Sequence, residues 1–115
     1  MNLQTSCTLV LIAAALLLTG CGPKHSYYWG DYEKSVYRMY HDEDFSPSKE
    51  INLLNGQIER ANKKNMNIGP GIYAHLGYLY TLHGDTAAAT QAFQSEKLAF
   101  PESAIMMNRL LEKLP

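Results

Sequence analysis

The sequence predicts an all-α protein of about five helices arranged as antiparallel helical hairpins. Apolar residues recur at intervals of three and four over successive segments after residue 30, and strand-like alternation does not compete with them. Glycine, proline and aspartate, which stop and start helices, fill the breaks between these segments. With 115 residues and a net charge of -1, the chain suits one small domain and lacks the basic cluster that nucleic acid requires.

The N-terminus carries an uninterrupted apolar run of ten residues, Leu9 to Leu18. A membrane-spanning helix needs about 20 apolar residues, so the run is typical of a signal-peptide core instead. The residues that follow, Leu18-Thr19-Gly20-Cys21, resemble the bacterial lipobox, whose cysteine is acylated before cleavage. We therefore expect residues 1–20 to be a cleaved lipoprotein signal peptide and Cys21 to be lipidated. The alternative is an uncleaved helical anchor, for which the run is too short.

Lipidation of Cys21 has consequences for chemistry and location. Cys7 lies in the expected signal peptide and Cys21 would carry lipid, so no thiol remains for a disulfide, a metal or catalysis. Gly22 is neutral, which in bacterial lipoproteins directs transfer to the outer membrane. We expect the membrane itself to be a partner through the lipid on Cys21, at the periplasmic face of the outer membrane. The inner membrane and the cell surface are the alternative locations.

The first helix of the folded domain is predicted over residues 32–41. Residues 21–30 are expected to be a lipidated tether, because turn formers fill their first half, and the domain should occupy residues 31–115. Apolar and aromatic side chains recur along 32–41 at the spacing of one helical face. They are Tyr32, Val36, Tyr37, Met39 and Tyr40.

The second helix is predicted from Pro47 to near Asn65, with Ser46 as its N-cap. Its apolar stripe should face the core, and charged residues including Glu50 should face solvent. The stripe is Ile51, Leu54, Ile58 and Ala61.

Three further helices follow. One should open at Pro70 and end near His83, and Gly84-Asp85 should join it to another that ends near Phe100. Residues 101–103 should then start a last helix with an apolar stripe. That stripe is Met107, Leu110, Leu111 and Leu114.

Residues 73–101 resemble one unit of a tetratricopeptide repeat (TPR). The large and small residues that carry the resemblance are Tyr73, Leu76, Gly77, Tyr80, Ala89, Phe93 and Pro101. Glu96 departs from the pattern, since alanine is usual there. The resemblance implies two antiparallel helices that cross closely at small residues, with the last helix acting as a cap.

Two longer stretches, residues 28–33 and 70–80, resemble an uncharacterised family of small bacterial TPR-like lipoproteins. That family is known by a domain of unknown function and by genes near those of curli-channel-like lipoproteins. The resemblance therefore implies a part in assembly of the cell envelope and names no reaction.

Catalytic and metal-binding motifs are not evident in the sequence. It contains no Gly-x-Ser-x-Gly, paired-carboxylate frame or phosphate loop, and its four histidines form no His-x-x-x-His pair. The acidic stretch 41–44 is better interpreted as a solvated turn than as a calcium loop. We expect no enzyme activity, no cofactor and no metal.

Candidate partner-binding residues lie in two places. Tyr78 and Thr81 occupy positions that face the concave groove in TPR proteins, and Tyr28 and Trp29 belong to an aromatic cluster that either packs in the core or anchors an interface. We expect a membrane-anchored protein–protein interaction module or assembly accessory of an envelope complex. The alternative is a lipoprotein that binds a small ligand or the cell wall in a pocket at Tyr28 and Trp29.

Overall fold

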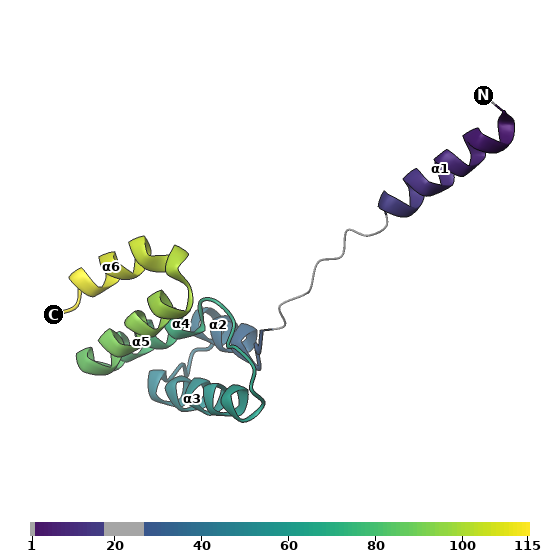
Figure 1. Cartoon of the computed structure of the whole chain (residues 1–115). Coiled ribbons are helices and arrows are strands. Elements are labelled where there is room, and N and C mark those ends of the chain that lie inside the picture. The colour runs from purple at the N-terminus through teal and green to yellow at the C-terminus, as the bar shows by residue number, and fades with distance from the viewer. Residues whose placement is uncertain (1, 18–26) are drawn as a thin grey trace.

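The computed structural model describes residues 2–17 and 27–115. Within them it contains six α-helices, one 3-10 helix and no strand (Figure 1), which confirms the all-α prediction and approximately the number of helices. The helices are α1 (Leu3–Leu17), α2 (Tyr32–His41), α3 (Pro47–Lys63), α4 (Ile72–His83), α5 (Thr86–Ala99), η1 (Pro101–Ser103) and α6 (Ala104–Glu112).

Helix α1 contains most of the N-terminal apolar run. It has 15 residues, and no helix among the described residues is long and apolar enough to cross a membrane. The lipobox residues that follow it, and Cys21 with them, lie outside the described residues.

Helices α3 to α6 pack in chain order, each against the next. The joint between α4 and α5 is the one predicted: Gly84 has a φ of 86° in the left-handed region, which glycine adopts without strain. The Asp85 carboxylate accepts a hydrogen bond of 3.0 Å from the Ala88 N–H at the start of α5. A two-residue connection therefore forces α4 and α5 into an antiparallel hairpin.

Two apolar clusters form the core. The larger one lies between α3 and α4, and the smaller one joins α5 to α6 through Ala89, Phe93 and Met107. Gly77 of α4 faces Phe93 so closely that a Cβ there would lie 2.6 Å from the ring carbon Cδ1. The close crossing predicted from small residues is therefore present in the α4–α5 hairpin. The larger cluster contains Ile51, Leu54, Ile68, Ile72, Leu76, Leu79 and Ala92.

One local prediction was wrong: Glu50 is buried, not solvent-facing, because it pairs with α2. Ser46 is the N-cap residue of α3, as predicted, although its hydroxyl makes no capping bond. The aromatic residues of α2 are divided: Tyr32 packs against the larger apolar cluster, whereas Tyr37 and Tyr40 are 64% and 73% exposed. The buried residue of α2 is Ser35.

Candidate partner-binding site

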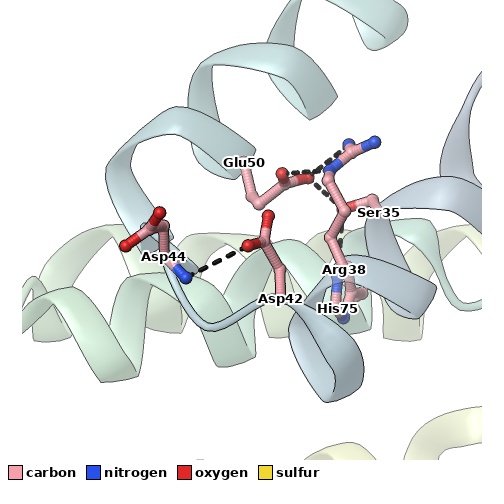
Figure 2. A network of polar contacts seen from close by, with 6 residues as sticks. All are labelled: Ser35, Arg38, Asp42, Asp44, Glu50 and His75. Carbon is pink, nitrogen blue, oxygen red and sulfur yellow. Dashed lines mark hydrogen bonds and ion pairs between the residues drawn. The ribbon is translucent and has the colours of Figure 1, made fainter.

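Helix α2 is attached to the rest of the domain by a polar network (Figure 2). The Arg38 guanidinium donates from Nε and Nη2 to the two oxygens of Glu50 on α3, at 2.6 and 2.8 Å. The fully buried Ser35 hydroxyl donates to Glu50 Oε2 at 2.7 Å. Glu50 therefore joins α2 to α3 by three charge-assisted hydrogen bonds, which are about twice as strong as neutral ones.

The network also reaches α4 through His75, whose Nε2 lies 3.4 Å from Ser35 Oγ. Because the hydroxyl proton of Ser35 is donated to Glu50, its oxygen is free to accept from an Nε2–H of His75. In a hydrolytic triad the imidazole would instead take the proton of the serine. With Ser35 fully buried as well, the geometry fits attachment of a helix and does not fit activation of a nucleophile.

The charges of the network are set by its contacts. Hydrogen bonds from Arg38 lower the pKa of the Glu50 carboxyl, and Ser35 adds to this effect, although burial acts in the opposite direction. Burial lowers the pKa of the His75 imidazole, against the influence of the Glu50 carboxylate. The folded protein therefore favours an ionised Glu50 beside a neutral His75.

The chain before α2 is bound to the loop between α3 and α4. The Tyr28 N–H donates to the carbonyl of Asn67 at 2.7 Å, and the Gly69 N–H donates to the carbonyl of Tyr28 at 3.1 Å. The Trp29 ring covers Gly69, where a Cβ would lie 2.5 Å from the ring, and Lys64 Nζ lies 5.2 Å from the centre of the Tyr28 ring. Residues 27–30, expected within the tether, thus fix the position of α2.

An open groove of about 760 Å³ runs along the outward side of α2. We call it the outer groove. Trp29, at 44% exposure, and the two exposed rings of α2 stand along it, and the Tyr37 ring stacks on that of His41 with 4.3 Å between centroids. The lining residues are Trp29, Gly30, Tyr32, Glu33, Val36, Tyr37, Tyr40 and His41.

A second groove of about 470 Å³ lies where α2, α4 and α6 meet, and we call it the inner groove. Its surface is mostly apolar, with Tyr78 of α4 and Met106 of α6 exposed by 44% and 62%. Methionines are flexible and polarisable, and they adapt to varied apolar partners. The remaining lining residues are Tyr32, Val36, Met39, Tyr40, Gly71, Ala74, His75, Glu96, Ser103, Met107 and Leu110.

Glu96 of α5 is buried at this groove and accounts for its departure from the repeat pattern. Its carboxylate oxygens accept hydrogen bonds from the Gly71 and Ala74 N–H groups at 2.7 and 3.3 Å. These N–H groups belong to the start of α4, where a helix has no internal acceptors and attracts negative charge. Burial raises the pKa of the Glu96 carboxyl, although these backbone hydrogen bonds act in the opposite direction.

The residues proposed from sequence are distributed between these features. Trp29 lines the outer groove and Tyr78 lines the inner groove, whereas Tyr28 lines neither and packs on the loop under Lys64. Thr81 is exposed beyond the inner groove, and its hydroxyl donates to the Gly77 carbonyl at 3.0 Å. Cys21 is outside the described residues.

Sequence reasoning missed the groups that hold the site together. Ser35 and Glu50 were assigned no role in it. A usable signal exists for Ser35, which follows Gly30 at the same interval at which the small residue Ala89 follows Gly84. Met106 was also missed, because it stands beside the apolar stripe of α6 and not within it. Within residues 2–17 and 27–115, no group of three or more His, Cys, Asp or Glu side chains could hold a metal ion.

Comparison with protein families gives one match. Residues 26–110 match the domain of unknown function DUF4810, and the protein belongs to this family. No curated protein and no solved structure matched the chain. The family description states no activity.

Proposed function

We propose that the protein is a lipid-anchored docking module that holds an apolar helix of an envelope protein in the inner groove. The observation that carries this proposal is the groove itself, lined by residues of α2, α4, α5 and α6, with Tyr78 and Met106 exposed at its surface. An amphipathic helix commonly binds in such an apolar groove through side chains three and four positions apart. Tyrosine is also among the residues that contribute most to binding at protein interfaces.

The packing of α4, α5 and α6 also supports docking of a helix in the inner groove. The α4–α5 hairpin crosses closely at Gly77 and Phe93, and α6 covers Phe93 on the next side. Stacked hairpins of this kind in TPR proteins form extended concave surfaces for peptides. We propose that α4, α5 and α6 are a TPR-like unit with its cap, and that α2 closes the groove on the other side.

The lipobox supports the anchored location. A cysteine bearing two or three acyl chains is held stably at a membrane, whereas one chain alone binds only marginally. We propose that Cys21 carries these chains at the periplasmic face of the outer membrane and that residues 1–20 are removed. Cys21→Ser should abolish incorporation of labelled palmitate and leave the unprocessed precursor. Unchanged labelling and mobility would contradict lipidation.

Site-specific crosslinking tests the docking role. A photoreactive amino acid placed at Met106, in cells that produce the lipidated protein, should crosslink to one defined envelope protein. The same amino acid at Leu98, which is 83% exposed on α5 and outside the inner groove, is the matched control and should not give that product. Equal products at both positions, or none at Met106, would argue against docking in the inner groove.

A second candidate function is binding of a small ligand or of the cell wall in the outer groove. The observation in its favour is that Trp29 lines this groove together with three tyrosines. Small-ligand sites usually enclose most of the ligand surface, whereas the outer groove is open along α2. Docking in the inner groove therefore remains the first proposal.

A further inference from the structure

We infer that the outward face of α2 lies on the surface of the bilayer that carries the lipidated cysteine. The face consists of Trp29, which precedes the helix, and of Val36, Tyr37 and Tyr40 on α2, and we call it the aromatic face. Val36 and Tyr40 also border the inner groove. The inference rests on the proposed lipidation of Cys21 and does not depend on docking in the inner groove. The occupant of this face is a phospholipid headgroup layer.

The composition of the aromatic face suits that layer. Tryptophan and tyrosine concentrate at membrane–water interfaces, because their rings are apolar and each carries one hydrogen-bonding group. Three such rings are exposed side by side on the outer groove, at 44%, 64% and 73% for Trp29, Tyr37 and Tyr40. A contiguous apolar surface of this kind on a small soluble domain usually marks an interaction site.

Charge does not oppose this contact. Glu33 is the one acidic residue among those that line the outer groove. Lys34 is engaged by Asp31 at 3.0 Å, and Arg38 is engaged by Glu50 on the inward side. The contact with lipid therefore depends on aromatic rings and not on a basic patch.

Chain length keeps the aromatic face close to the membrane. Five residues lie between Cys21 and Tyr27, so the six steps from one to the other span at most about 22 Å at roughly 3.6 Å per residue. From Tyr28 onward the chain is fixed to the loop at Asn67 and Gly69, and Trp29 follows at once. The part of the domain nearest the anchor in sequence is thus the part that exposes the rings.

The attachment of α2 fixes how the rings are presented. Ser35 points into the domain, and Tyr37 follows it by two positions, which is about 200° around a helix. The hydrogen bonds of Ser35 and Arg38 to Glu50 hold this orientation. Tyr37 and Tyr40 therefore point outward without any rearrangement on contact with lipid.

The chain provides its own reporter, because Trp29 is its single tryptophan. The full lipidated protein is reconstituted into vesicles of phosphatidylethanolamine and phosphatidylglycerol, and its fluorescence is compared with that in matched vesicles with brominated acyl chains. We expect loss of emission with brominated lipid and protection of Trp29 from aqueous acrylamide. Emission unaffected by brominated lipid and fully open to acrylamide would overturn the inference.

Variants that keep Trp29 identify the face responsible. Tyr37→Ser combined with Tyr40→Ser should reduce quenching by brominated lipid and increase quenching by acrylamide. Leu98→Ser, which also removes an exposed apolar side chain but from α5, should leave both unchanged. Circular dichroism should show equal helical content in all three proteins, since none of these side chains is buried. Equal quenching in all three would overturn the role of the aromatic face.

Flotation of the same vesicles separates the two proposals. Protein that does not float with lipid lacks a working anchor, which defeats both the lipidation of Cys21 and the inference that depends on it. Protein that floats but shows no quenching retains the anchor and defeats the aromatic face alone. Protection of Trp29 from acrylamide in native membranes, but not in vesicles that contain no other protein, would show that a protein covers the face. That result would overturn the lipid contact.

Discussion

The α4–α5 hairpin and helix α2 are held in the same small domain by opposite means. The hairpin is joined through shape, with the Phe93 ring seated against Gly77 and covered by Met107 of α6. Helix α2 is joined through charge, with Glu50 accepting hydrogen bonds from Ser35 and Arg38. Tyr32, at the start of α2, also packs against the larger apolar cluster, but Tyr37 and Tyr40 of the same helix are exposed.

This difference separates stability from function within the domain. Close apolar packing keeps the hairpin fixed. Removal of a large side chain from such a core lowers the free energy of unfolding by several kcal/mol. A polar attachment lets α2 keep a defined position while its aromatic side remains outside. The domain can therefore expose Trp29 and Tyr40 at its surface, because packing of its core does not require these side chains.

Removal of Phe93 is the strongest way to break the hairpin. Phe93→Ala should lower the free energy of unfolding by about 3–5 kcal/mol, because it leaves a cavity between α4, α5 and α6. Urea unfolding followed by circular dichroism measures this loss. Leu98→Ala on the same helix removes an 83% exposed side chain and should change stability by less than about 0.5 kcal/mol. Similar losses for the two variants would contradict the packing described for the hairpin.

Removal of the charge on Glu50 is the corresponding way to release α2. Glu50→Gln should lower the free energy of unfolding by about 1–3 kcal/mol, since Arg38 loses its partner while the side-chain volume is kept. Arg38 is 31% exposed, so water replaces part of what is lost. Hydrogen exchange should quicken across residues 32–41 and stay slow across 72–99.

The adjacent Lys49→Gln provides the control for this variant. It also removes one charge from the first turns of α3, but Lys49 is exposed and has no part in the network. Exchange in α2 should then match that of the unmodified protein. Faster exchange throughout α4 and α5 in Glu50→Gln would show that α2 and the hairpin unfold as one unit, and would contradict the separate attachment of α2.

The sequence allowed most of the fold to be predicted because its signals were local. Gly84-Asp85 specifies a stop and a cap within two residues, and Pro47 marks the first turn of α3. The small residues Gly77 and Ala89 indicated a close crossing without any knowledge of distant contacts. Periodicity alone placed the boundaries of α2 correctly, at Tyr32 and His41.

The orientation of α2 could not be predicted in the same way. Periodicity shows that apolar residues share a face, but which face is buried depends on partners elsewhere in the chain. Ser35 is buried only because Glu50 and His75, 15 and 40 residues away, offer it hydrogen bonds. Glu96 gave a clearer signal, since an acidic residue at a position that favours alanine suggests a specific partner, here the start of α4.

The stability of the fold should also depend on pH, with a smaller effect, because His75 belongs to the attachment of α2. Burial lowers its pKa below the ordinary imidazole value of 6.5, so below that value the unfolded chain binds a proton more readily than the folded protein. The free energy of unfolding should therefore fall as pH drops from about 7 through 6.5 towards the folded pKa. Glu96, whose raised pKa favours folding at low pH, acts in the opposite direction.

Substitution isolates the contribution of His75 from that of Glu96. Unfolding free energies of the unmodified protein and of His75→Gln, measured between pH 7.5 and about pH 5, should differ in slope, with the variant less sensitive to acid. His83→Gln removes an exposed histidine from the same helix and should keep the slope of the unmodified protein. If His75→Gln keeps that slope as well, protonation of the imidazole costs the fold nothing, and the buried neutral histidine is not part of what attaches α2.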